Sequence, residues 1–218
     1  MHKHDVVARI LRTGVIAIVR LDSAESLQKV ADAILEGGID IIEFTMTTPG
    51  ALAILESATA KFGDRVILGA GTVLDPESAR AAVLAGARFV VSPNLNPRTI
   101  ELCHRYGVVA IPGVLTPTEI VAAMEAGADL IKIFPASLGG PDYIRAVRAP
   151  LPQASLVPTG GVEVDNAGEY IRAGAVAVAI GSSLVNKKWV AAGDFAKMAD
   201  TARRLVEAIR VARTGAGG

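Results

Sequence analysis

AGADLIKIFP, residues 126–135, ends one helix and begins one buried strand, and this stretch decides the fold. Gly127 between two alanines is typical of a helix end, because glycine readily adopts the left-handed conformation that turns the chain back. The run from Leu130 to Phe134 is apolar except for Lys132, and it lacks the alternation of a half-exposed strand, so it predicts a strand buried on both faces. Helix, glycine turn and buried strand in this order predict a parallel sheet covered by helices.

The same unit recurs along the whole chain of 218 residues. Eight apolar runs are expected to be strands, at residues 15–20, 39–45, 66–72, 88–93, 108–114, 129–135, 155–161 and 175–181. Eight strand-and-helix units predict an α/β fold of the (β/α)8 TIM-barrel type. The alternative is an open doubly wound sheet, which is disfavoured because no dinucleotide-binding glycine pattern follows a strand.

The length predicts one domain that spans residues 1–218. Residues 1–13 are expected to form an extra N-terminal helix across the bottom of the barrel, and residues 194–213 are expected to form the closing helix. Residues 214–218 are expected to be a frayed tail.

The composition limits the classes of partner and the compartment. Lys plus Arg and Asp plus Glu both number 22, so no net charge attracts the chain to nucleic acid or to an anionic membrane. No apolar stretch has the roughly 18 residues that a membrane span needs. The single cysteine excludes an internal disulfide, and no signal-peptide pattern opens the sequence, so we expect a cytoplasmic protein.

Two charged residues interrupt strands that are otherwise apolar, and both are candidate catalytic groups. Glu43 lies in the second predicted strand, where burial would raise its pKa toward the range that acid–base catalysis uses. Lys132 lies in the sixth, where burial would supply the neutral amine that attacks a ketone. The alternative for Glu43 and Lys132 is a structural ion pair inside the barrel.

Arg20 and Thr72 stand at the ends of the first and third predicted strands. The Arg20 guanidinium can hold a carboxylate in a bidentate fork, and Thr72 can add a hydroxyl after two glycines that let a substrate approach. The alternatives are a solvated arginine and a helix-capping or turn threonine.

Glycine-rich turns follow the last two strands, with Thr159, Gly160 and Gly161 after the seventh and Gly181, Ser182 and Ser183 after the eighth. Barrels commonly bind phosphate with backbone N–H groups at these two positions. Tight turns without a ligand are the alternative. The histidines share no metal-ligand spacing with Cys103, so no metal site is predicted.

With these residues in place, the sequence resembles the family of 2-keto-3-deoxy-6-phosphogluconate (KDPG) aldolases and 4-hydroxy-2-oxoglutarate (KHG) aldolases. The resemblance extends from the N-terminal helix to about Val206. The matching motifs are Gly37-Gly38, Ile42-Glu43-Phe44-Thr45, Gly69-Ala70-Gly71-Thr72-Val73, Val91-Ser92-Pro93, Ile111-Pro112-Gly113-Val114, Thr116-Pro117-Thr118-Glu119, Lys132-Ile133-Phe134-Pro135-Ala136 and Pro158-Thr159-Gly160-Gly161-Val162.

The resemblance implies a class I aldolase that uses no metal and no cofactor and assembles as a homotrimer. It implies that Lys132 forms a Schiff base with the substrate and that Glu43 is the acid and base. It places Arg20, Thr72, Pro93, Phe134 and Thr159 at the carboxylate and hydroxyl groups of a 2-keto-3-deoxy sugar acid. It places the phosphate at Gly160, Gly161, Gly181, Ser182 and Ser183.

One departure from the family pattern affects the specificity. The phosphogluconate enzymes have an arginine four residues after the glutamate, where this chain has Thr47, while Arg20 matches an arginine of the phosphogalactonate aldolases. Thr159, however, matches the phosphogluconate enzymes. The substrate can therefore be either C4 epimer, phosphogluconate or phosphogalactonate, and the phosphogluconate form is preferred. A phosphate-binding isomerase or synthase and a non-catalytic barrel are the alternatives of another class.

Overall fold

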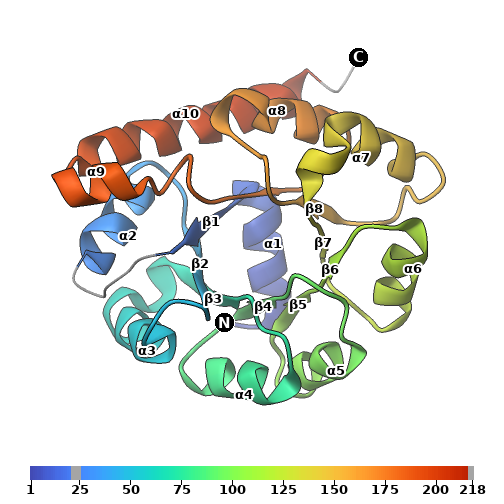
Figure 1. Cartoon of the computed structure of the whole chain (residues 1–218), viewed down its shortest axis with the longest axis horizontal. Coiled ribbons are helices and arrows are strands. Elements are labelled where there is room, and N and C mark those ends of the chain that lie inside the picture. Colours follow the sequence, from blue (N-terminus) through green and yellow to red (C-terminus); the bar gives the residue numbers. More distant parts are fainter. Residues whose placement is uncertain (21–25, 216–218) are drawn as a thin grey trace.

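The strands close into a parallel barrel, which confirms the predicted fold (Figure 1). The computed structural model describes residues 1–20 and 26–215. The strands are β1 (Val15–Val19), β2 (Ile41–Thr45), β3 (Ile67–Gly71), β4 (Phe89–Val91), β5 (Val109–Ile111), β6 (Gly113–Val114), β7 (Ile131–Ile133), β8 (Leu156–Pro158) and β9 (Val178–Ile180). They pair in the orders β5-β4-β3-β2-β1-β9 and β6-β7-β8. A parallel bridge between Thr159 and Ala179 joins the two sheets on one side, and the chain runs from β5 into β6 on the other.

The fifth predicted strand, residues 108–114, is divided into β5 and β6 at Pro112. The prediction of one continuous strand was wrong because proline has no N–H group to donate to a ladder. β5 pairs with β4, whereas β6 pairs with β7. The Lys132 N–H still donates to the carbonyl of Pro112 at 2.9 Å, so the order of strands around the barrel is unchanged.

Helices surround the barrel on the outside, except α1, which lies across one end of the barrel (Figure 1). They are α1 (Lys3–Thr13), α2 (Leu27–Glu36), α3 (Ala51–Phe62), α4 (Pro76–Leu84), α5 (Pro97–Arg105), α6 (Pro117–Glu125), α7 (Gly140–Arg148), α8 (Val164–Arg172), α9 (Lys187–Ala192) and α10 (Phe195–Thr214), with short 3-10 helices η1 (Gly63–Arg65) and η2 (Ala136–Leu138). Asp75, Asn96 and Thr116 cap α4, α5 and α6 by accepting hydrogen bonds from backbone N–H groups, and a proline follows each cap.

The glycine turn predicted at Gly127 is confirmed at the end of α6, and the same turn ends α2, α4 and α8 before the next strand. Gly38, Gly86, Gly127 and Gly174 have φ of 92°, 103°, 87° and 104°, in the region that favours glycine. A side chain at Gly86 would also place its Cβ 2.4 Å from Thr59 Oγ1. These four turns set the direction in which each following strand enters the barrel.

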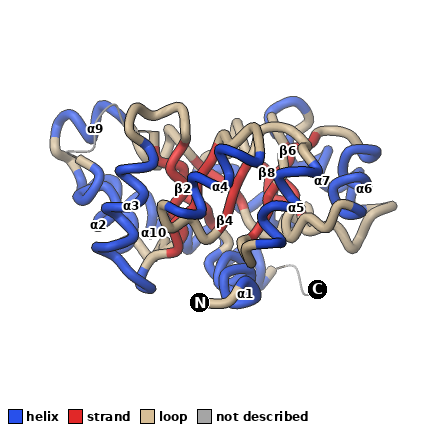
Figure 2. Tube along the Cα trace, turned by 90° about the horizontal axis from the view of Figure 1, so that it is seen from below, coloured by secondary structure: helices blue, strands red, loops and turns tan. Residues whose placement is uncertain are grey.

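The lumen of the barrel is closed at the amino ends of the strands by α1 (Figure 2). Val6 and Ile10 of α1 pack against lumen side chains such as Ile16 and Phe89, and Ile10 and Phe89 are fully buried. The predicted N-terminal helix is therefore confirmed. Because the bottom of the lumen is packed, a substrate can enter only at the carboxyl ends of the strands.

The C-terminal helix α10 packs against α2 and α8, and it confirms the predicted closing helix. Thr214 ends α10, and residues 216–218 of the expected frayed tail lie outside the described residues. No described helix has both the length and the apolar character that crossing a membrane requires.

Candidate active site

Lys132 and Glu43 reach the lumen from β7 and β2, which lie on opposite sides of the barrel. Glu43 is in register with Ile18, and Lys132 is in register with Val157. Ile18 and Val157 both belong to the lumen cluster, and paired residues of neighbouring strands point to the same face. The Lys132 and Glu43 side chains are only 6% and 2% exposed. The two groups that interrupt the apolar strands therefore share one buried space.

Burial dominates the electrostatics of this pair. It raises the pKa of the Glu43 carboxyl above its usual value, while the positive charges of Lys132 and Arg20 act in the opposite direction. It lowers the pKa of the Lys132 amine, which Glu43 opposes and Arg20 reinforces. A lowered lysine pKa supplies the neutral nucleophile, and a raised carboxyl pKa suits proton transfer near neutral pH.

The Glu43 carboxyl lies directly against the backbone of Gly71, at the end of β3. A Cβ at Gly71 would lie 1.7 Å from Glu43 Oε1, a distance that no side chain can occupy. Glu43 Oε2 is buried and has no hydrogen-bond partner among the described residues. The absence of a side chain at Gly71 therefore leaves room for the Glu43 carboxyl group.

Three further predicted residues follow the carboxyl ends of β3, β4 and β7, and one of them contacts Lys132. The ring centroid of Phe134 lies 4.8 Å from Lys132 Nζ. Pro93 follows β4, and its backbone contacts Gly113, the residue paired with Lys132: a Cβ at Gly113 would lie 2.5 Å from the Pro93 carbonyl carbon. Thr72, directly after β3, has φ of 59°, a conformation that costs a β-branched residue about 1–3 kcal/mol. Strain of this kind is concentrated at functional sites, and it supports a role for Thr72.

The two predicted phosphate loops lie side by side. The Ser183 hydroxyl donates to the carbonyl of Val162 at 3.5 Å, and the Thr159 bridge to Ala179 joins the strands before the loops. Thr159 itself is buried, and Gly160 and Gly161 have φ of 85° and 80°. A Cβ at Gly161 would lie 2.6 Å from Ser137 Cβ, so only glycine fits this turn.

Arg20 lies beside the predicted phosphate loop that follows β9. It lines a pocket of about 370 Å³ at the carboxyl ends of β1 and β9, together with Gly181 and Ser182. The pocket volume lies within the usual range of about 300–1,000 Å³ for small-molecule sites. Thr47, at the place of the missing family arginine, is exposed in the turn after β2.

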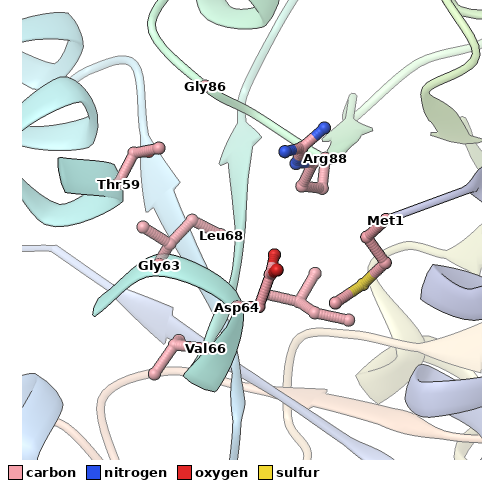
Figure 3. Close-up of a pocket in the computed structure, with 9 residues that line it drawn as sticks. Met1, Thr59, Gly63, Asp64, Val66, Leu68, Gly86 and Arg88 are labelled. Carbon is pink, nitrogen blue, oxygen red and sulfur yellow. The ribbon is translucent and has the colours of Figure 1, made fainter. Parts of the chain in front are cut away.

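A smaller cavity of about 70 Å³ lies at the amino ends of β3 and β4 (Figure 3). Asp64 and Arg88 line it together with Met1 (Figure 3). TIM-barrel active sites lie at the opposite, carboxyl end, and the cavity is well below the roughly 300 Å³ of a typical ligand site. We therefore assign it no substrate. Within the described residues, no group of three or more His, Cys, Asp or Glu side chains could hold a metal ion.

Sequence reasoning missed the outer wall of the larger pocket. Asn186, Lys187 and Lys188 line it, although they follow the last glycine loop by several residues. Two consecutive lysines shortly after a strand-end Gly-Ser pair are a signal that could have identified them.

The comparisons with known proteins agree with this geometry. The family model "KDPG and KHG aldolase" matches residues 6–201. The chain is 38% identical to 2-dehydro-3-deoxy-phosphogluconate aldolase of Treponema pallidum, over 92% of this chain and 95% of that protein. It is 39% identical to a probable 2-dehydro-3-deoxy-6-phosphogalactonate aldolase of Rhizobium meliloti, over 82% of this chain and 84% of that protein.

A solved structure extends the comparison to the chemistry. KDPG aldolase of Legionella pneumophila, with pyruvate captured as a covalent carbinolamine intermediate, superposes with a TM-score of 0.86 at 29% identity. The match covers 91% of this chain and 97% of that one. The chain belongs to the KDPG and KHG aldolase family.

Proposed function

We propose that the protein is a class I aldolase that cleaves 2-keto-3-deoxy-6-phosphogluconate to pyruvate and glyceraldehyde 3-phosphate. The same site would cleave 4-hydroxy-2-oxoglutarate to pyruvate and glyoxylate. The observation that carries the proposal is the buried lysine and glutamate in one lumen, because burial moves the pKa of each toward the value that Schiff-base chemistry uses.

The reaction begins when neutral Lys132 attacks the C2 ketone to form a carbinolamine, and loss of water gives an iminium. Glu43 supplies and removes the protons of these steps. The C4 hydroxyl then gives its proton to the Glu43 carboxylate, the C3–C4 bond breaks, and the electron pair of this bond moves into the iminium. The aldehyde leaves, and the pyruvate enamine stays on Lys132. Protonation of C3 and hydrolysis release pyruvate and the free amine.

The other residues of the site bind the substrate in this proposal. Thr72 donates a hydrogen bond to the pyruvyl carboxylate, Pro93 and Phe134 flank the reacting carbon atoms, and Thr159 contacts a substrate hydroxyl. The phosphate is bound by the loops that contain Gly160, Gly161, Gly181, Ser182 and Ser183. Their juxtaposition through the Ser183 hydrogen bond supports one continuous anion site.

A 2-keto-3-deoxy-6-phosphogalactonate aldolase is the second candidate. It is favoured by Arg20 together with Thr47, and by the 39% identity to the probable phosphogalactonate enzyme of Rhizobium meliloti. Thr159 favours the phosphogluconate substrate. Steady-state kinetics with both C4 epimers would decide between them.

The decisive test is the intact mass after borohydride reduction with pyruvate. We expect a pyruvyl adduct on the wild-type protein and none on Lys132→Ala. A wild-type protein without an adduct at saturating pyruvate would refute the class I mechanism and favour a phosphate-binding isomerase or synthase. An adduct without exchange of the pyruvate methyl protons would favour a barrel that binds without catalysis.

The proposal also includes a homotrimer in the cytoplasm, as the family resemblance implies. Native mass spectrometry should then give a species of three times the 22.5 kDa chain. A monomer at micromolar concentration would contradict the trimer and leave the mechanism unaffected.

A further inference from the structure

The pocket of about 370 Å³ has two walls of different origin. One wall is formed by the ends of β1 and β9, and the other by the segment that leads into α9. The residues that line it are Ile18, Arg20, Gly181, Ser182, Val185, Asn186, Lys187 and Lys188. Only the first wall is part of the site that the family motifs mark.

The first wall belongs to the same lumen as Glu43. Ile18 is in register with Glu43, and Arg20 follows Ile18 by two positions, so it continues the same face of the chain. Gly181 follows Ala179 of the lumen cluster by two positions as well. Arg20 also influences the pKa of both Glu43 and Lys132. The pocket is therefore a lateral extension of the active site.

The second wall is held rigidly over the end of β9. The Gly181 carbonyl accepts hydrogen bonds from the N–H groups of Leu184 at 3.0 Å and Val185 at 2.8 Å, which fold the chain back. Leu184 and Val185 are buried and anchor the turn. Asn186 Oδ1 then accepts from the Lys188 N–H at 2.9 Å and fixes the start of α9. The backbone of Lys188 is thus fixed by a short series of hydrogen bonds that begins at Gly181, directly after β9.

We propose that Lys188 is a specificity-determining residue that binds the phosphate at the far end of the substrate, in the pocket that Arg20 lines from β1. This inference rests on the proposed function and assigns a cationic partner to its phosphate. Lys188, Lys187 and Arg20 are the charged residues among the described part of the lining. The backbone N–H groups of the glycine loops are neutral donors, whereas a phosphate is bound more strongly by charged donors. Since the chain has no net charge, this attraction has to be local.

The test compares Lys188→Met, Lys188→Arg and the matched control Lys61→Met. Lys61 is exposed on α3, outside the pocket, and its substitution removes the same charge. The measured quantities are kcat/KM for 2-keto-3-deoxy-6-phosphogluconate, kcat/KM for unphosphorylated 2-keto-3-deoxygluconate, and the rate of pyruvyl adduct formation. Calorimetric binding of glycerol 3-phosphate supplies a readout that does not depend on catalysis.

We expect Lys188→Met to lower kcat/KM for the phosphorylated substrate about tenfold, as for loss of a charged hydrogen bond. In Lys188→Met, kcat/KM for the unphosphorylated substrate and the rate of pyruvyl adduct formation should be unaffected, and glycerol 3-phosphate binding should weaken. Lys188→Arg should restore most of the wild-type ratio of kcat/KM for the phosphorylated substrate to kcat/KM for the unphosphorylated one. Lys61→Met should behave as wild type. An unchanged ratio of the two kcat/KM values in Lys188→Met, including an equal loss of kcat/KM with both substrates, would overturn the inference. Slower adduct formation would also overturn it, because pyruvate has only the carboxylate end. If the wild-type protein forms no adduct, the proposed function fails, and glycerol 3-phosphate binding by wild type and Lys188→Met then decides the role of Lys188 separately.

Discussion

Gly71→Ala is expected to inactivate the enzyme by displacing Glu43 while Lys132 stays in place. The added Cβ would lie 1.7 Å from Glu43 Oε1, 2.3 Å from Cδ and 2.7 Å from Cγ. These distances cannot be relieved by a small rotation, because the whole carboxyl end of the side chain is too close. Gly71 does not have a positive φ, so the backbone itself tolerates alanine, and the effect acts through Glu43.

Gly69→Ala is the matched control for this substitution. Gly69 lies two positions earlier on β3, on the same face, and its added Cβ would lie 2.4 Å from the Phe89 ring. Overpacking a core costs about 1–3 kcal/mol, so both variants should be destabilised by similar amounts. For a chain of this size, each kcal/mol lowers the melting temperature by about 2–4 °C. Only Gly71→Ala should remove a catalytic proton carrier, which is worth about 100-fold to 10,000-fold in rate.

The assay is the exchange of pyruvate methyl protons with deuterium, followed by NMR, together with borohydride trapping of the adduct. Gly71→Ala should still be trapped with pyruvate, because Lys132 remains, but its exchange rate should fall at least 100-fold below that of Gly69→Ala. Exchange rates within a few-fold of each other in the two folded variants would refute the assignment of Glu43 as the proton carrier.

Three further substitutions test individual residues of the site. Arg20→Met should move the pH at which adduct formation is half-maximal to a higher value, because Arg20 lowers the pKa of Lys132; a shift to lower pH contradicts this. Thr72→Asn should raise the free energy of unfolding by roughly 1 kcal/mol, because asparagine tolerates the left-handed region of φ, and it should lower kcat/KM. A lower melting temperature than wild type would argue against backbone strain at Thr72. Thr159→Val keeps the size of a buried side chain and removes its hydroxyl. The value of kcat/KM for the phosphogluconate epimer should then fall relative to that for the phosphogalactonate epimer. An unchanged ratio of the two values would exclude Thr159 as the residue that distinguishes the C4 epimers.

Much of the fold could be predicted because its signals are local. The glycine turns at Gly38, Gly86, Gly127 and Gly174 need no tertiary information, and the buried strands are continuous apolar runs. Lys132 and Glu43 were identifiable for the same reason, since a charge inside such a run is costly unless it is used or paired. The division of the fifth strand was also predictable in principle from Pro112, but the neighbouring apolar residues concealed it.

The remaining features depend on contacts between segments that are distant in the sequence. The purpose of Gly71 follows from the Glu43 side chain on the neighbouring strand, which no local pattern reveals. The φ of Thr72 is imposed by the turn after β3. Lys188 lines the pocket because the segment after β9 folds back on Gly181. Arg20 lies beside the glycine loop after β9 because β1 and β9 are neighbours in the closed barrel.

Arg20 adds a third charge to the electrostatics of the Lys132 and Glu43 pair, after burial and the attraction between the two groups. A lysine and a glutamate alone stabilise each other in their charged forms, since Glu43 raises the pKa of Lys132 and Lys132 lowers the pKa of Glu43. An ammonium cannot attack a ketone. Arg20 lowers both pKa values, so it favours the carboxylate and the neutral amine together. Burial remains the largest influence on both groups, and Arg20, directly after β1, reinforces its effect on the Lys132 pKa and opposes its effect on the Glu43 pKa. In the proposed mechanism, Arg20 therefore favours the neutral Lys132 amine that attacks the ketone.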